Sequence, residues 1–102
     1  MTARAIVVDE RDTVATALAD LAAGEVLLLP IGDRERRVHL KAPIAFGHKV
    51  ALKVIAAGDP VVKYGEAIGR ATRAIAAGDH IHLHNLESLR GRGDLRGRGD
   101  LR

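Results

Sequence analysis

Short apolar stretches separated by turn-forming residues run along the whole sequence and predict a domain built mainly of β-strands. The stretches are rich in Val, Ile and Leu, and Gly, Pro and Asp stand between them. The predicted strands cover residues 4–8, 25–29, 37–41, 49–54, 61–64 and 81–83. Residues 68–75 fit a helix or a strand, because their apolar period is ambiguous.

One short helix is expected between the first two strands. Asp12 can cap its start, and Val14, Leu18 and Leu21 fall at positions i, i+4 and i+7. Gly24 can then end the helix. The predicted fold class is therefore mainly β, a small irregular domain of many short strands with one short helix.

A five-residue pattern of an apolar residue, Ala, Ala, Gly and an acidic residue occurs three times. The copies begin at Leu21, Ile55 and Ile75, and the intervals of 34 and 20 residues are too unequal for a solenoid repeat. We interpret each copy as one tight turn, in which the glycine takes a positive φ and the acidic residue leads into a strand.

The charge distribution divides the chain into a domain, residues 1–89, and a Gly/Arg-rich tail, residues 90–102. The first part holds eleven Lys and Arg against eleven Asp and Glu, whereas the tail holds five Arg and two Asp. The tail therefore accounts for the whole net charge of +3. Because its composition cannot bury a core, we expect a flexible segment or a docking arm.

The composition excludes several functional classes. A domain with no net charge and only two aromatic residues, Phe46 and Tyr64, lacks the basic surface and stacking platforms of a nucleic-acid-binding protein. No apolar run reaches about 18 residues, and the first residues lack the apolar stretch of a signal peptide. The absence of cysteine rules out disulfides and thiolate metal sites. We therefore expect a cytoplasmic protein that binds neither nucleic acid nor membrane.

Three histidines, His80, His82 and His84, alternate along the last predicted strand. In an extended strand they share one face, while Ile81 and Leu83 point into the core. Neighbouring members have Cα atoms roughly 6.6 Å apart, so one adjacent pair could bind a metal ion that takes further ligands from elsewhere. Imidazole suits Fe²⁺, Mn²⁺ or Zn²⁺ and also acts as an acid or base near neutral pH. The spacing does not choose between these roles and an ordinary polar strand face.

Two further segments carry candidate functional residues. His48 follows Gly47 at a loop-to-strand junction, where functional side chains are often held, although a surface histidine is the simpler alternative. Lys63 could contact an anionic substrate. Tyr64 is expected on the opposite face of the same strand, partly in the core.

Together these segments resemble the N-terminal SAF domain of the altronate and galactarate dehydratases. The resemblance runs in order from about residue 4 to residue 95, and it is carried by residues 47–52, 62–65, 68–69 and 78–85. The final His-x-His-x-His-Asn is more similar to the altronate dehydratase and sulfolactate sulfo-lyase branches than to the galactarate branch. The resemblance implies a β-clip-type fold.

The resemblance also implies a reaction. The family removes water from sugar acids, or sulfite from sulfolactate, by taking a proton next to a carboxylate and expelling a β-substituent. It uses a divalent metal, and Fe²⁺ is the expected ion, with Mn²⁺ as the alternative. The implied site residues are His48, Lys63 and Tyr64 as catalytic groups, Lys49 and Asn85 as substrate ligands, and His82 and His84 as metal ligands.

Full-length dehydratases of this family carry a second, larger domain after the SAF domain, and we expect no such domain in this chain. The resemblance therefore implies a small subunit that completes the site of a large dehydratase subunit and is inactive alone. A sulfolactate sulfo-lyase small subunit, which acts on a hydroxy-sulfonate, is the alternative within the enzyme class. A non-catalytic module that binds sugar acids or stabilises its partner is the alternative outside it, and assembly as a homo-oligomer remains open.

Overall fold

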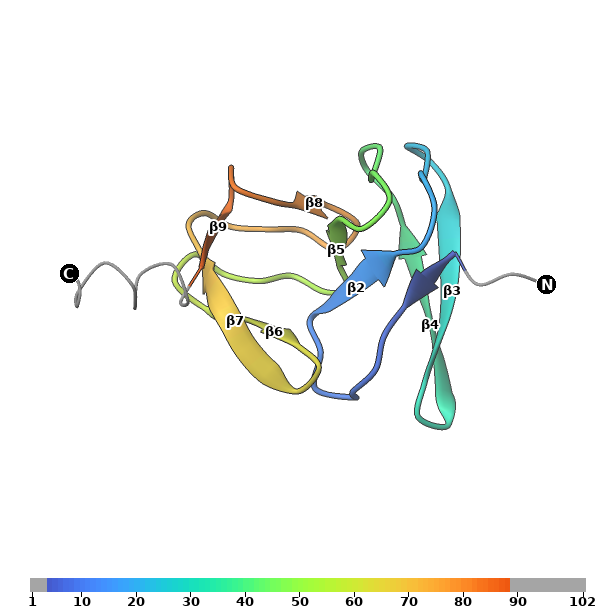
Figure 1. Ribbon diagram of the computed structural model, residues 1–102, viewed down its shortest axis with the longest axis horizontal. Helices are drawn as coiled ribbons and strands as arrows, with labels where there is room; N and C mark the ends of the chain where they lie inside the picture. Colours follow the sequence, from blue (N-terminus) through green and yellow to red (C-terminus); the bar gives the residue numbers. More distant parts are fainter. Residues whose placement is uncertain (1–3, 89–102) are drawn as a thin grey trace.

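The computed structural model describes residues 4–88, which form nine β-strands and no helix (Figure 1). The strands are β1 (Ala5–Ile6), β2 (Val14–Ala17), β3 (Val26–Ile31), β4 (Arg34–His39), β5 (Lys49–Ala51), β6 (Pro60–Lys63), β7 (Glu66–Ala71), β8 (His80–Ile81) and β9 (Leu86–Ser88). The prediction of a mainly β domain is confirmed. No helix in this range is long and apolar enough to cross a membrane. The predicted tail, residues 90–102, lies outside the described residues.

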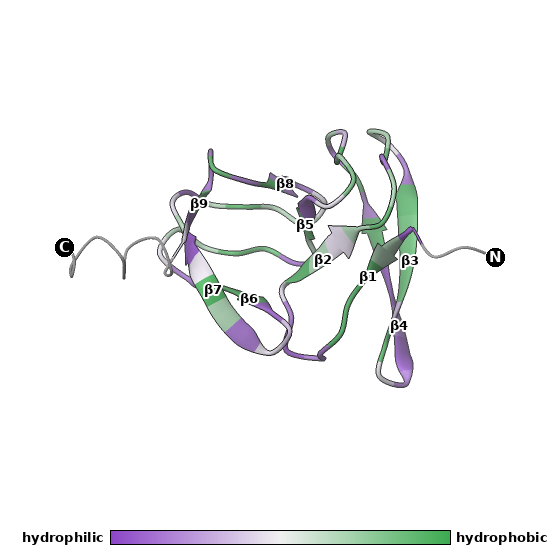
Figure 2. Cartoon of the chain, viewed as in Figure 1, coloured by the Kyte–Doolittle hydropathy of each residue, from purple (hydrophilic) through white to green (hydrophobic). Residues whose placement is uncertain are grey.

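The strands form three antiparallel sheets. A four-stranded sheet, in the order β1-β2-β5-β8, lies in the middle, the β3–β4 hairpin lies on one side and the β6-β7-β9 sheet on the other (Figure 1). Figure 2 shows the contrast within the hairpin between apolar β3 and the hydrophilic first half of β4. The central sheet therefore separates two smaller units.

Two aliphatic cores occupy the two sides of the central sheet. Neighbouring residues of β2 face different cores, since Ala15 packs in the first and Val14 in the second. The same alternation puts Val50 of β5 in the first core and Ala51 in the second. Successive side chains of a strand point to opposite faces, so β2 and β5 contribute to both cores at once.

The predicted helix after Asp12 is wrong, because this segment forms β2. Its residues pair with β1 on one side and with β5 on the other. Of the apolar positions that suggested a helical face, Leu18 is 41% exposed. Hydrogen bonding to two neighbouring strands and burial of both faces outweigh the local apolar period. The ambiguous segment 68–75 is strand only as far as Ala71.

The interpretation of the five-residue turns is confirmed, and the structure adds a fourth copy. Gly24, Gly58 and Gly78 have φ angles of 86°, 90° and 90°. The fourth copy covers residues 44–48, where Gly47 has a φ of 84° and a histidine replaces the acidic residue.

The four turns meet in two pairs. Leu21 and Ile44 exchange backbone hydrogen bonds of 2.8 and 3.0 Å, and Ile55 and Ile75 do the same at 2.9 and 2.8 Å. Each pair closes one half of the domain, and both halves share β5. The chain thus repeats one arrangement, a hairpin with a turn at each end.

The glycine turns differ in how much space surrounds them, which gives a stability test. A Cβ at Gly78 would overlap the carbonyl oxygen of His39, whereas a Cβ at Gly24 would meet nothing within 4 Å. Gly24→Ala should lower the free energy of unfolding by about 1–2 kcal/mol, the cost of a left-handed conformation. Gly78→Ala should cost roughly 3 kcal/mol or more, because overpacking adds to that strain. Urea denaturation of both variants measures the difference, and equal losses would contradict this account.

Candidate functional site

Two segments that are far apart in the sequence bring four histidines together. His48 ends the second turn just before β5, and His80 begins β8, which pairs with β5. The His48 Nδ1 and His80 Nε2 atoms lie 2.9 Å apart, a hydrogen-bonding distance. We call His48, His80, His82 and His84 the histidine cluster.

The rings of His48, His80 and His82 lie nearly parallel to one another, and the ring of His84 is tilted. The centroids of His48 and His82 are 4.4 Å apart with planes at 3°, and those of His48 and His80 are 5.1 Å apart at 16°. His84 lies beyond His80, at 5.5 Å and 37°. All four imidazoles therefore lie in a single group near the surface, where His82 and His84 are exposed.

The histidines form a compact group because β8 is short and the chain turns back directly after it. β8 ends at Ile81, and the chain turns back through residues 82–85, so Leu83 is 83% exposed instead of buried in the core. An extended strand would have carried His80 and His84 about 13 Å apart. The turn replaces this row of histidines with a compact group.

Asn85 holds this turn in place. Its side chain is buried, and its Oδ1 accepts a hydrogen bond of 3.0 Å from the backbone N–H of His82. Its Nδ2 donates one of 2.9 Å to the carbonyl of His80. Asn85 was expected to bind substrate; both ends of its amide instead contact the backbone of the histidine segment.

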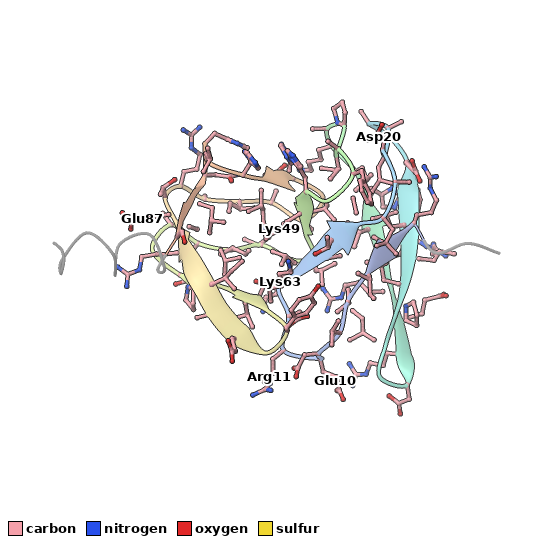
Figure 3. All side chains as sticks on the ribbon, in the orientation of Figure 1. Glu10, Arg11, Asp20, Lys49, Lys63 and Glu87 are labelled. Atoms are coloured by element: carbon pink, nitrogen blue, oxygen red, sulfur yellow. The ribbon has the colours of Figure 1, made fainter. Side chains whose placement is uncertain are left out.

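His48 occupies the position that an acidic residue takes in the other turns. In two of those turns the carboxylate accepts an N–H three residues back, Glu25 from Ala22 at 3.1 Å and Asp79 from Ala76 at 2.8 Å. In the His48 turn, the carboxylate of Asp20 accepts the Phe46 N–H at 2.9 Å. Figure 3 labels Asp20 at the same end of the domain as this turn. Asp20 was not predicted from the sequence, although the histidine at the acidic position of a fourth turn is a signal for this place.

The metal assignment to His82 and His84 stays a prediction. Among residues 4–88, no group of three or more His, Cys, Asp or Glu side chains is arranged to hold a metal ion. His48 and His82 present their faces to each other, whereas the nitrogen lone pairs that bind a metal lie in the ring planes. The exposed His82 and His84 fit part of a donor set for Fe²⁺ or Mn²⁺, whose other ligands would come from outside this group.

A second candidate group lies at the turn between β6 and β7. Tyr64 and Gly65 have φ angles of 56° and 78°, as a two-residue type I′ turn requires. The Nζ of Lys63 lies 4.8 Å from the centre of the Tyr64 ring, a cation–π distance. The prediction that the two side chains point to opposite faces is wrong, and Tyr64 is 52% exposed instead of partly in the core.

Lys49 joins Lys63 and Tyr64 in an open groove. The groove is also lined by Ile68 and Leu86 from β7 and β9. Figure 3 shows Lys49 and Lys63 near one another between the central sheet and β6. Burial, and then the charge of Lys63, lower the pKa of Lys49. An anion bound in this groove would offset the unfavourable charge of the partly buried Lys49 ammonium.

The histidine cluster and the groove meet in the sequence at His48 and Lys49. The structure thus gathers His48, His82 and His84 in one group and Lys49, Lys63 and Tyr64 in another. His80, which belongs to the cluster, was not among the implied site residues. Its pKa is lowered, first by burial and then by the proximity of the other three histidines, His48 foremost.

Acidification should destabilise the domain through His80. Because its pKa is lower in the folded chain, the unfolded chain takes up the proton first, near the ordinary value of about 6.5. The free energy of unfolding should therefore be constant above this pH and fall as the pH drops through it. Urea denaturation at pH 8 and pH 5.5 measures this loss of the free energy of unfolding. His80→Gln should reduce the loss, whereas His39→Gln, at an exposed position on β4, is the control and should leave it unchanged. Equal falls in both variants would contradict the assignment.

Comparison with known proteins identifies the relatives of this fold and site. A model of the altronate/galactarate dehydratase SAF domain matches residues 3–89. The altronate dehydratase of Escherichia coli (strain K12) is 47% identical over 77 residues, which are 76% of this chain and 15% of that protein. The (2R)-sulfolactate sulfo-lyase subunit alpha of Chromohalobacter salexigens is 33% identical over 88 residues, 83% of this chain and 94% of that subunit. The same subunit of Paracoccus pantotrophus is 48% identical over 54 residues, 53% of this chain and 81% of that subunit.

The matched proteins differ in how much of their own length this chain covers. This chain spans 15% of the length of the E. coli altronate dehydratase but most of the two sulfo-lyase subunits. The family match covers both the histidine cluster and the lysine groove. The chain therefore belongs to the family of altronate/galactarate dehydratase SAF domains.

Proposed function

We propose that this chain is the SAF subunit of a metal-dependent, altronate dehydratase-like enzyme that eliminates water from a sugar acid together with a large partner subunit. The observation that carries the proposal is that one small domain gathers four imidazoles in one group and two lysines in an open groove, with His48 and Lys49 consecutive in the chain. Such a site combines groups that can move protons with groups that can bind a carboxylate. The altronate dehydratase relatives favour this reaction.

The lysine groove would bind the substrate's carboxylate. Lys63 is held over the Tyr64 ring, and Lys49 is partly desolvated, so an anion entering the groove neutralises charge that is otherwise unfavourable. Binding the carboxylate next to the reacting carbon also favours loss of the neighbouring proton, because the two cations stabilise the enolate-like charge that develops.

The hydrogen-bonded pair of His48 and His80 would move the proton. One imidazole nitrogen of the pair donates and the other accepts, so a proton taken up by one ring is shared with its neighbour. Because its pKa is lowered, His80 is neutral near pH 7 and available as a base. Tyr64, whose ring lies beside the Lys63 ammonium, has a hydroxyl that can donate a hydrogen bond to the leaving group.

His82 and His84 would contribute two ligands to the metal. When bound, Fe²⁺ or Mn²⁺ supplies Lewis-acid stabilisation of the substrate's negative charge. The two imidazoles are exposed in the turn held by Asn85, so they are accessible to ligands on another subunit. A large partner would complete this donor set and exclude water from the open groove.

Two other functions have specific support. The chain covers 94% of one sulfolactate sulfo-lyase subunit alpha, which favours a role as the small subunit of an enzyme that releases sulfite from a hydroxy-sulfonate. A non-catalytic binding module would use the same lysine groove without the histidine cluster. The substrate that the complex converts distinguishes the sulfo-lyase from the dehydratase. Loss of activity in the histidine variants distinguishes either enzyme from a binding module.

The enzymatic proposal predicts that the exposed histidines are needed for turnover. The chain, with the large protein that co-purifies with it, should show metal-dependent elimination on altronate, galactarate or sulfolactate. His82→Ala or His84→Ala should lower kcat about 100-fold, as expected for lost metal ligation, and His39→Ala should leave kcat unchanged. Unchanged turnover in the His82 and His84 variants would contradict catalysis by this cluster. Activity on sulfolactate alone would favour the sulfo-lyase.

The groove should act mainly in binding. Lys63→Met should raise KM about tenfold in the active complex, the effect of losing one charge-assisted contact to a carboxylate. Lys41→Met, an exposed lysine outside the groove, is the matched control and should leave KM unchanged. A normal KM for Lys63→Met, measured from initial rates, would place the carboxylate elsewhere.

A further inference from the structure

A buried carboxylate holds the Lys63–Tyr64 turn from the opposite end of the sequence. Asp12, in the loop between β1 and β2, is only 7% exposed. Its Oδ1 accepts a hydrogen bond of 2.8 Å from the backbone N–H of Gly65. Its Oδ2 accepts the N–H groups of Asp9 at 3.2 Å and Val8 at 3.4 Å. The carboxylate therefore joins its own loop to the turn between β6 and β7.

The next residue fixes the other side of the same turn. The Thr13 N–H donates to the Val62 carbonyl at 3.0 Å, and the Val62 N–H donates to Thr13 Oγ1 at 3.0 Å. Contacts to residues 62 and 65 thus enclose Lys63 and Tyr64 between them. These contacts hold the backbone on both sides of Lys63 and Tyr64, the two residues of the turn that line the groove.

The turn requires such support because its conformation is unfavourable. Tyr64 is the one residue other than glycine among residues 4–88 with a positive φ, and left-handed backbone is unfavourable for a residue with a Cβ. The loop also packs closely on the turn. A Cβ at Gly65 would come within 2.7 Å of Arg11 Nη2 and 2.9 Å of Asp9 Oδ2. Figure 3 shows Arg11 beside this turn.

The loop that carries Asp12 is itself ordered by a local ion pair. Arg11 Nε lies 2.9 Å from Asp9 Oδ1, and the hydrogen bond from the Arg11 side chain is the main cause that lowers the pKa of Asp9 to about 2. Asp9 therefore stays ionised over the whole range in which enzymes work. The ion pair is exposed, so it orders the loop locally, whereas the buried Asp12 makes the contact to the turn.

We propose that Asp12 is a positioning residue for the Lys63–Tyr64 pair, which it holds in the left-handed turn that places both side chains in the groove. The proposal rests on the proposed function only in assigning Lys63 and Tyr64 to the substrate. Loss of the carboxylate releases the Gly65 N–H, the turn relaxes, and the groove loses its fixed cation. The expected consequence is weaker substrate binding without loss of the histidine cluster.

Amide hydrogen exchange of the full chain tests the contact directly. Asp12→Ala should raise the exchange rate of the Gly65 amide by about tenfold or more, because a hydrogen bond to a buried charge is lost. Asp12→Asn keeps the shape and one acceptor, so it should fold and show a smaller, several-fold rise. The Gly32 amide, in the corresponding turn of the β3–β4 hairpin, is the internal reference. Asp33→Asn, an exposed aspartate in that hairpin, is the matched control.

Tyr64 gives an independent spectroscopic measure. It is the single tyrosine of a chain without tryptophan, so the intrinsic fluorescence reports on this residue alone. Asp12→Ala should lower the fluorescence anisotropy of Tyr64 and increase its quenching by iodide. Asp12→Asn should restore most of the wild-type signal, and Asp33→Asn should match the wild type.

Two results would overturn the proposal. One is a Gly65 exchange rate unchanged in both Asp12 variants, and the other is an equal rise at Gly65 and Gly32, which would indicate general destabilisation. In the active complex, Asp12→Asn should raise KM, as Lys63→Met does. A normal KM for Asp12→Asn beside a raised KM for Lys63→Met would also overturn the proposal. If Lys63→Met itself is fully active, the proposed function of the groove fails, while the exchange and fluorescence results still decide the role of Asp12.

Discussion

The antiparallel pairing of β5 with β2 on one side and β8 on the other is the interaction on which the rest of this domain depends. It supplies the backbone hydrogen bonds that join the two halves, and its alternating side chains Val50 and Ala51 enter different cores. The same strand begins at Lys49, directly after His48. The pairing that stabilises the fold therefore also brings His48 to the histidines of β8 and the turn that follows it.

The candidate site lies where the repeated arrangement of hairpins and turns departs from its own pattern. Three of the four turns place an acidic residue after the glycine, and the fourth places His48 there. Asp20, from another segment, accepts the Phe46 N–H of that turn, and the imidazole stacks on its partners instead. A second departure is Tyr64, whose left-handed backbone is held by Asp12. Local strain and substituted contacts thus coincide with the residues proposed to act on substrate.

Much of the fold follows from local patterns. Strands β3, β4 and β6 and the glycine turns were predicted, because runs of apolar residues and Gly-acid pairs act through neighbouring residues, whereas β7 was left open between helix and strand. The segment after Asp12 was predicted incorrectly. Its apolar spacing fits a helix, but it is buried between two strands whose partners lie in distant parts of the chain. The row of histidines was likewise predicted to be extended, whereas the buried side chain of Asn85 turns it back.

The sequence by itself determined that this is a small, mainly β, aliphatic domain, and it indicated histidines and lysines as the candidate functional residues. These properties depend on composition and on spacing within a few residues, both of which can be read along the chain. Only the tertiary structure decided that His48 lies against His80 and His82, and that Asp12 holds the turn of Lys63 and Tyr64. The physical reason is that these contacts join residues more than thirty positions apart. Their geometry is set by strand register and by single buried hydrogen bonds, which local sequence patterns do not specify.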